Sequence, residues 1–359
     1  MTDPETKVTE EIDPGPSSPR PSQDIPPAVS VLVFLRDRGI FVLWAVLIAV
    51  FAIWCSPYFF TVNNGLLIAN AASLTALFAA AAGIGIMTGV LDLSLPGTAA
   101  IAGCVCGWLL THGHSTWLGL TAGLLCGLVV GLINGLITIR GFNPIIVTIG
   151  TLSVLSGLAA VITGGYTFPG LTQLEFMGTR RYFEVGSFSG VPAPVFVVVV
   201  VFVLGTLFLT RTRDGIRLMA VGANAEAVRR AGIHADRYRV FGFMLSGLLA
   251  ALGGLVTTAV VTEASPSASL ETIFDALTAV ALAGVALTGG RGSLPRVLVG
   301  ALILATISNG LTIRGVQPYW ATACTGALLL LSLLFERLVQ TGVSERLMSA
   351  NLSVHGRKV

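Results

Sequence analysis

Long apolar runs separated by short polar segments dominate this chain. They lie at about residues 39–61, 66–90, 95–112, 117–139, 143–163, 192–210, 240–262, 272–290, 296–313 and 317–338. Each is close to the ~20 residues that a helix needs to cross a hydrocarbon core of ~30 Å. The pattern therefore predicts an all-α polytopic membrane protein with about ten transmembrane helices. The third and ninth runs are short, and the proline near the start of each would permit a broken or tilted helix.

The longest charged interruption is the segment 211–239, which holds seven arginines. Within it, Asn224 is a favourable N-cap, because its side-chain oxygen can accept a hydrogen bond from a free backbone N–H of the first turn. Glu226 in that turn complements the helix dipole, and Gly232 can close the helix in the left-handed conformation. These residues predict a helix of about eight residues, too short to be stable alone in water. We expect it to dock on the body of this protein or on a partner; a solvated loop that only fixes topology is the alternative.

Arginines are distributed unevenly around the apolar runs. With the N-terminus inside, fourteen of them flank the runs on the inner side, against three on the outer side, Arg180, Arg181 and Arg314. Because positively charged loops stay in the cytoplasm, both termini and the segment 211–239 are expected there.

The two ends of the chain lack long apolar runs. The first 30 residues hold seven of the sixteen prolines, mixed with serine and acidic residues. Such a segment cannot bury enough apolar surface to fold, and it has no apolar core of a signal peptide. We expect a disordered cytoplasmic tail over 1–34, a transmembrane domain over 35–340 and a cytoplasmic tail over 341–359.

A short motif recurs with one deletion. Residues 134–144 read NGLITIRGFNP, and residues 309–318 read NGLTIRGVQP. The first copy lies between the fourth and fifth runs and the second between the ninth and tenth. An offset of five spans reverses direction, so the two copies predict an inverted internal repeat. A second likeness, TG…SLP at 88–96 and 288–295, does not fit that offset and is interpreted as coincidental.

Two features inside the apolar runs stand out. Five glycines spaced by four residues lie within the run at 117–139. They could let another helix approach closely, or some of them could line a transport pathway. Asp92 is the one carboxylate well inside the first bundle, and an Asp at the bilayer centre costs about 2.5–3.5 kcal/mol. It could hydrogen-bond a polyol, cap a broken helix or accept a proton. Glu263, Glu271 and Asp275 flank an outer loop, where they could meet a basic partner or simply be solvated.

Composition excludes several classes of protein and site. Only 11% of residues are charged, against roughly a quarter in soluble domains, and the net charge of +3 gives no nucleic-acid surface. The five cysteines form no metal-binding spacing, and two histidines in an outer turn have no companion ligands, so no metal site is predicted. The only lysines are Lys7 and Lys358, so the chain cannot carry a phosphate-binding loop that ends in Gly-Lys-Ser/Thr. ATP hydrolysis would need a separate subunit.

The string at 222–233, GANAEAVRRAGI, resembles the G-x-N-x-x-A-x-x-x-x-G-I cytoplasmic loop of ribose-type ABC sugar-importer permeases. Three more stretches resemble motifs of that family: VLDLS around Asp92, NPIIVTIGT at 143–151 and GVQPYW at 315–320. The four follow the family order over about 85–335. Pro96 and Ile145 depart from the family pattern.

The resemblance implies the membrane permease subunit of an importer for a monosaccharide or similar small polar solute, in the bacterial cytoplasmic (inner) membrane. It implies a second copy of the permease, an extracytoplasmic solute-binding protein and a cytoplasmic ATP-binding subunit that holds the ATP and magnesium. This chain itself would carry no cofactor and no enzymatic activity. The residues expected to couple to the ATPase subunit are Gly222, Asn224, Glu226, Ala227, Arg229, Arg230, Gly232 and Ile233. The candidates for the translocation pathway are Asp92, Ser94, Asn143 and Thr148.

Two alternative functions stay open at this point. A permease of the same superfamily for branched-chain amino acids or nucleosides would carry similar scaffold and coupling motifs. A secondary transporter driven by protons or sodium is an alternative from another class, since it also uses inverted repeats. Such a transporter usually has several intramembrane acids or basic relays, whereas here only Asp92 and, marginally, Asp275 qualify.

Overall fold

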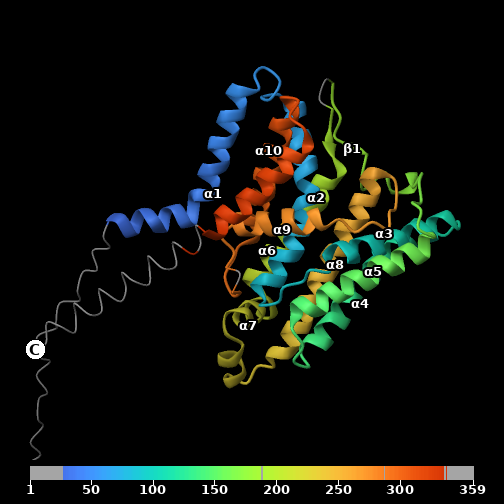
Figure 1. The fold of residues 1–359 in the computed structure, drawn as a ribbon, viewed down its shortest axis with the longest axis vertical. Coiled ribbons are helices and arrows are strands. Elements are labelled where there is room, and N and C mark those ends of the chain that lie inside the picture. Colours follow the sequence, from blue (N-terminus) through green and yellow to red (C-terminus); the bar gives the residue numbers. More distant parts are fainter. Residues whose placement is uncertain (1–26, 187–188, 287, 335–336, 338–359) are drawn as a thin grey trace, which may run out of the picture.

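The computed structural model describes residues 27–186, 189–286, 288–334 and 337 of the chain (Figure 1). Its helices are α1 (Pro27–Trp54), α2 (Val62–Met87), α3 (Leu95–Thr111), α4 (Thr116–Thr138), α5 (Pro144–Thr163), α6 (Ala193–Arg211), α7 (Arg213–Arg230), α8 (Ala235–Val261), α9 (Leu270–Leu282) and α10 (Leu294–Ile313). A further apolar helix covers Pro318–Leu334. A 3-10 turn at Thr172–Leu174 and two short antiparallel strands, β1 (Arg181–Tyr182) and β2 (Val191–Pro192), lie between α5 and α6.

Each predicted span contains a helix over at least part of its length. Among the described residues, six helices are long and apolar enough to cross a membrane: α2, α4, α5, α6, α8 and α10. Three shorter apolar helices, at Arg38–Trp54, α3 and Pro318–Leu334, cover three more of the predicted runs. The prediction of an all-α polytopic membrane protein is confirmed at this level, with β1 and β2 as a small addition outside the helices.

The predicted span at 272–290 is wrong in its second half. α9 ends at Leu282, and its 13 residues extend only about 20 Å, less than the ~30 Å of a hydrocarbon core. Gly284, at φ 67°, is the second residue after the helix, and Gly289 and Gly290 have φ values of 90° and 73° in the loop beyond. Glycine adopts such left-handed conformations without strain, so this loop can turn where apolar composition alone suggested a continuing helix.

The expected boundary of the N-terminal tail is also displaced. α1 begins at Pro27, so the tail predicted over 1–34 overlaps the start of this helix. Residues 1–26 and the predicted C-terminal tail at 341–359 lie outside the described residues.

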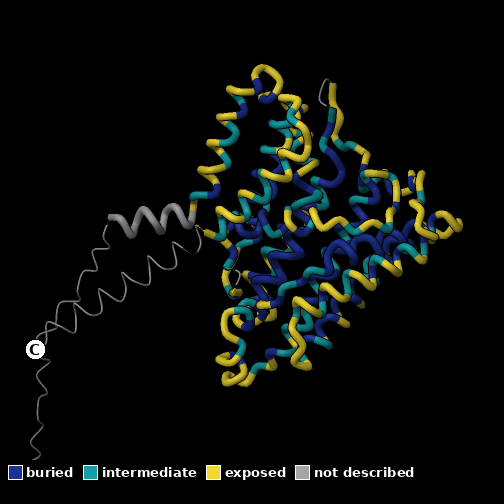
Figure 2. Tube along the Cα trace, viewed as in Figure 1, coloured by how far each residue is buried: buried dark blue, intermediate teal, exposed yellow. Residues whose placement is uncertain are grey.

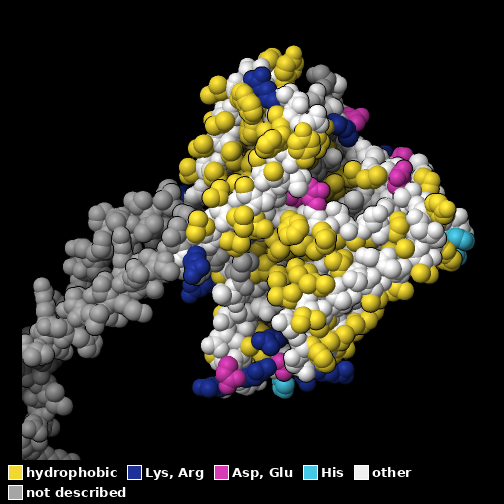
Figure 3. All heavy atoms as spheres, viewed as in Figure 1, with side chains coloured by type: hydrophobic (Ala, Val, Ile, Leu, Met, Phe, Trp, Pro, Cys, Tyr) yellow, Lys and Arg dark blue, Asp and Glu magenta, His cyan; other side chains and the backbone are white. Residues whose placement is uncertain are grey.

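Two opposite ends of the bundle can be defined from contacts of α2. At its start, the Asn63 side-chain oxygen accepts a hydrogen bond from the Ser189 hydroxyl at 2.8 Å, close to β1 and β2. At its end, the Met87 carbonyl oxygen accepts from the Gly290 amide, next to α7. We call these the hairpin end and the α7 end. α7 lies at the bottom of Figure 1, and Figure 3 shows charged side chains gathered there, with large hydrophobic areas between this end and the top.

The apolar cluster with the most buried residues surrounds the second half of α2, which is dark blue in Figure 2. Residues Ala76–Met87 are buried there, and α8, α9 and α10 supply most of the apolar partners. The glycines spaced by four residues along α4 pack against α8: a Cβ at Gly127 would collide with the Gly247 carbonyl oxygen, and one at Gly131 with that of Phe243. These glycines therefore permit close helix packing, as one of the two sequence interpretations held.

The two copies of the NGL…RG motif form similar local structures. Asn134 and Asn309 each lie four residues before the last residue of their helix, α4 and α10. Gly141 and Gly315 follow with φ values of 98° and 70°, and a proline begins the next helix in both copies. The Asn309 amide nitrogen donates to the side-chain oxygen of Asn64 at 2.9 Å, so this copy lies at the hairpin end. α4 instead ends beside the start of α8, towards the α7 end.

Candidate functional site

The second half of α7 is a capped short helix. The helix is interrupted at Asn224, whose φ of −160° and ψ of 94° are extended. The Asn224 side-chain oxygen accepts a hydrogen bond from the Ala227 amide at 3.0 Å. At the other end, Gly232 has φ 80°, and the Ile233 amide donates to the Val228 carbonyl oxygen at 3.2 Å. The N-cap and the glycine stop predicted from the sequence are therefore present.

The charged side chains of this short helix are exposed and pair locally. Arg229 lies 2.8 Å from Asp236, and Arg230 lies 3.3 Å from Glu226. Such exposed pairs add little to stability, because water screens them and both side chains lose freedom. Their main effect is to give the α7 end a hydrophilic surface of paired positive and negative side chains.

An apolar cluster holds α7 on the body of the protein. Val221, Val228 and Ala235 are buried together, with Ile233 and Tyr238 packed against them. Because the last two belong to the turn after α7 and to α8, the short helix is joined to the start of α8. Docking on the protein itself was one of the two possibilities left open by the sequence.

Gly222 lies where three segments meet. A Cβ at Gly222 would collide with the Met87 carbonyl oxygen and lie 2.9 Å from the Gly290 nitrogen. A Cβ at Gly289 would lie 2.7 Å from the Gly222 carbonyl oxygen and 3.1 Å from the Cα of Gly89. We call Gly89, Gly222, Gly289 and Gly290 the glycine junction. It brings α7, the segment after α2 and the loop after α9 into direct backbone contact, which side chains would prevent.

The glycine junction also changes the interpretation of one sequence pattern. The TG…SLP likeness at 88–96 and 288–295 falls on the two loops that meet there, each followed by a helix with proline near its start. The likeness therefore coincides with a shared structural role, although it does not follow the offset of the predicted repeat.

Asp92 is the centre of a buried hydrogen-bond network in the non-helical segment between α2 and α3. One carboxylate oxygen accepts from the Ser94 amide at 2.9 Å and the Ser94 hydroxyl at 2.6 Å, and the other accepts from Ser246 at 3.1 Å. The Asn134 amide donates to Ser94 at 3.0 Å, and its oxygen accepts from Thr151 at 2.6 Å. This network ties the break before α3 to α4, α5 and α8, so Asp92 orders the backbone there.

The other two pathway candidates have local partners. The Asn143 side-chain oxygen accepts from the Ile145 amide at 2.9 Å and caps α5. Thr148 is fully buried, and its hydroxyl donates to the Ile145 carbonyl oxygen at 3.3 Å. The structure brings Asp92 and Ser94 together, but none of the four candidates is among the residues that line the cavity described next.

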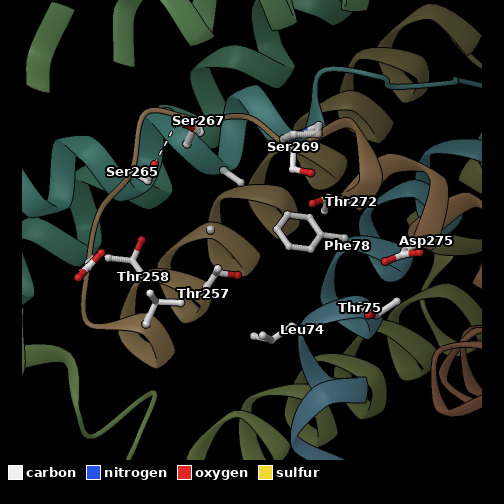
Figure 4. A pocket seen from close by; sticks show the side chains of 16 residues that line it. Leu74, Thr75, Phe78, Thr257, Thr258, Ser265, Ser267, Ser269, Thr272 and Asp275 are labelled. Carbon is white, nitrogen blue, oxygen red and sulfur yellow. Dashed lines mark hydrogen bonds between the residues drawn. The ribbon is translucent and has the colours of Figure 1, made fainter. Parts of the chain in front are cut away.

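A cavity of about 330 Å³ lies between α2, α3, α8, α9 and the segment 262–269 (Figure 4). This segment belongs to the hairpin end, since the Phe168 amide and the Ala264 carbonyl oxygen are hydrogen-bonded at 2.9 Å. Serine and threonine hydroxyls, two carboxylates and the Phe78 ring line the cavity. The carboxylates, Glu263 and Asp275, were noticed in the sequence only as flanking an outer loop, where they could meet a basic partner or be solvated, and the hydroxyls were missed. The alternating serines at 265, 267 and 269 were the available signal.

Comparison with known proteins identifies the class of protein. Residues 64–333 match the family described as "Branched-chain amino acid transport system / permease component". The chain belongs to this permease family. Its members are transport subunits, so the chain is a permease component rather than an enzyme.

Similar curated proteins are permeases named for sugars. The ribose import permease protein RbsC of Bacillus subtilis is 36% identical over 256 residues, which cover 70% of this chain and 78% of that protein. RbsC of Escherichia coli K12 is 32% identical over 86% of this chain and 95% of its own length. The L-arabinose transport system permease protein AraH of the same strain is 32% identical over 84% and 90%. The resemblance to ribose-type permeases is confirmed; no solved structure matches the chain.

Proposed function

We propose that this protein is the membrane-spanning subunit of an ABC importer that moves a monosaccharide or similar small polar solute into the cell. The observation that carries the proposal is the similarity, over most of the chain, to permeases named for ribose, L-arabinose and D-allose. The family description mentions branched-chain amino acids, and these solutes are the nearest alternative.

α7 is the element that we assign to coupling. The capped half beyond Asn224 presents charged side chains at the surface, while its apolar side is fixed to α8. A cytoplasmic ATP-binding subunit, which would hold the ATP and magnesium, would dock on this half. A movement of the docked ATP-binding subunit would displace α7. Through Gly222 this displacement would reach the segment after α2 and the loop after α9, because the backbone of α7 contacts both directly. Glu226, Ala227, Arg229, Arg230, Gly232 and Ile233 would form or shape the docked surface.

The α7 end is proposed to face the cytoplasm of a bacterium, with both termini on that side of the inner membrane. The arginine distribution supports this orientation. The opposed positions of the two NGL…RG motifs support an inverted repeat, which is a common basis of alternating access. An inverted arrangement would let one half move against the other around the cavity and the break before α3.

Two more partners complete the proposed assembly. A second copy of the permease and an extracytoplasmic solute-binding protein are inferred from the resemblance to ribose-type importers. α5 supplies an apolar face for a second copy or for lipid. Only 17% of its 18-residue apolar stretch is buried, and Ile146 and Val161 are more than 70% exposed. The hairpin end would receive the binding protein.

Reconstitution tests the proposal directly. The permease, its candidate ATP-binding subunit and binding protein would be placed in proteoliposomes, and uptake of labelled ribose, L-arabinose, D-allose and leucine would be measured with and without ATP. ATP-dependent sugar uptake that requires all three proteins is the expected result. Uptake by the permease alone under a proton or sodium gradient would instead identify a secondary transporter, and ATP-dependent uptake of leucine alone would identify an amino-acid permease.

A further inference from the structure

The cavity beside α2 has the size of a small-molecule site. Its volume of about 330 Å³ lies at the lower end of the range of about 300–1,000 Å³ that is usual for ligand pockets. The segment 262–269 forms its rim, where Glu263, Ser265, Ser267 and Ser269 are exposed. Phe78 and Thr258 are buried and line its inner part. A solute from the hairpin end could therefore enter over the rim and reach the middle of α2.

The position of the cavity fits a transport site. Its inner wall includes Pro96 and Ala99 at the start of α3, just after the break that Asp92 orders. Sites in transporters commonly lie near the middle of the membrane beside such discontinuous helices. The opposite end of the same break, at Gly89, contacts α7 through the glycine junction. The cavity is thus connected to the proposed coupling element by a short stretch of ordered backbone.

The lining is rich in groups that bind hydroxyls. Figure 4 shows the Phe78 ring in the middle of the lining, with Ser269 and Thr272 on one side of it and Thr257 on the other. Serine and threonine hydroxyls both donate and accept hydrogen bonds, and the carboxylates of Glu263 and Asp275 accept them from sugar hydroxyls. An aromatic ring adds an apolar surface for the C–H groups of a sugar.

Charge argues for a neutral polyol rather than an amino acid. Two carboxylates are among the sixteen lining residues, all of which the structure describes, but none of the sixteen is lysine, arginine or histidine. An amino acid could pair its ammonium group with these carboxylates, but its own carboxylate would enter this acidic cavity without a cation from the lining, and burying an unpaired charge is strongly unfavourable. A monosaccharide carries no charge and avoids this cost.

Building on the proposed sugar import, we propose that this cavity binds the transported monosaccharide within a single permease chain, on its route from the hairpin end. Thr257 and Thr272 on the wall, with Asp275, hydrogen-bond the sugar, and Ser265 and Ser267 form the entrance. Each copy of the chain in an assembly would then hold its own sugar site.

Site-directed labelling tests this occupancy in the assembled transporter. Ser267→Cys places a thiol on the exposed rim. Thr111→Cys places one on the last residue of α3, which is also exposed but does not line the cavity. In proteoliposomes, the rate of alkylation by a membrane-impermeant maleimide would be compared with and without ribose, L-arabinose or D-allose. The unsubstituted chain, whose cysteines are buried or half-buried, gives the background.

We expect the sugar that the same vesicles transport to slow labelling of Ser267→Cys at least about threefold and to leave Thr111→Cys unchanged. ATP-dependent uptake without such protection, at sugar concentrations that saturate uptake, would overturn the cavity proposal and leave the proposed function intact. Absence of sugar uptake would instead count against the proposed function. The two failures are therefore distinguishable.

A pair of matched threonines gives a second test. The Thr257 hydroxyl donates to the Gly253 carbonyl oxygen at 2.9 Å, and that of Thr121 donates to Trp117 at 2.8 Å, so each makes the same bond within its helix. Only Thr257 lines the cavity. Thr257→Val should raise the sugar concentration for half-maximal uptake about fivefold, as expected for the loss of one hydrogen bond, while Thr121→Val should not change it. Equal effects of the two substitutions would contradict the proposal.

Discussion

The Gly290 amide donates a hydrogen bond to the Met87 carbonyl oxygen, with nitrogen and oxygen 2.9 Å apart. This bond joins the end of α2 to the loop after α9, and Gly222 of α7 covers the same oxygen. Because backbone meets backbone at this point, no side chain can rearrange to absorb a displacement of α7. The contact therefore offers a stiff connection between the proposed coupling element and the segments that precede α3 and α10.

Gly222→Ala should disrupt this connection. The added Cβ would collide with the Met87 oxygen, and overpacking of this kind typically costs about 1–3 kcal/mol. We expect reduced sugar uptake for each ATP hydrolysed, measured in proteoliposomes from uptake and phosphate release. Gly65→Ala is the matched control, since a Cβ at this exposed helical position meets no atom within 4 Å. Unchanged coupling in the Gly222 variant would remove the glycine junction from the transmission route.

Asn224 should be needed for the shape of the docking surface. Asn224→Ala removes the acceptor of the Ala227 amide, and loss of an N-cap typically costs about 1 kcal/mol of helix stability. We expect less ATP-binding subunit to co-purify with the variant from detergent extracts, at equal amounts of permease. Asn224→Asp keeps an acceptor oxygen and should restore most of the recovery. Equal recovery with all three chains would exclude this half of α7 from the contact.

A substitution at Gly232 tests the effect of backbone conformation without a change in packing inside the chain. Its φ is 80°, yet a Cβ there would meet no atom of this chain within 4 Å, so within the chain any effect of a side chain arises from the backbone conformation alone. Gly232→Val should strain the helix stop by about 1–2 kcal/mol and weaken ATP-dependent uptake, whereas Gly232→Asn should be tolerated better. The measurement is uptake at matched levels of protein in the membrane. Normal uptake by the valine variant would contradict the coupling assignment.

The local features of the proposed coupling element were accessible from sequence because they depend on near neighbours. Asn224 acts on the third residue after it, and Gly232 closes the same short helix. The partners of Asp92 were not accessible, since Ser246 is 154 residues away and no periodic pattern connects the two. The cavity was missed for a similar reason: its hydroxyls come from α2, α8, α9 and a loop. The end of α9 was misplaced because its apolar composition continues into a glycine-rich loop.

The role of Asp92 is the sharpest point at which the structure alters an expectation from the sequence. As the lone carboxylate within the first apolar bundle, it was a candidate for direct contact with solute, for which Asp92→Asn would impair transport more than assembly. In the structure, three donors from Ser94 and Ser246 already occupy its oxygens, and it does not line the cavity. In Asp92→Asn the amide oxygen could still accept from Ser94 and the NH2 group could donate to the Ser246 hydroxyl, but neutral hydrogen bonds would replace those of the carboxylate, which are roughly twice as strong when it is ionised.

We therefore expect Asp92→Asn to lower the thermal stability of the detergent-extracted protein and its level in the membrane, with uptake falling in proportion to that level. Ser246→Ala, which removes a single 3.1 Å bond, should have a smaller effect in the same direction. A full level of stable protein with greatly reduced uptake would instead assign Asp92 to the transport step. The two outcomes separate the roles because both carboxylate oxygens already have partners within the protein, and a residue that only orders the break before α3 must act through stability.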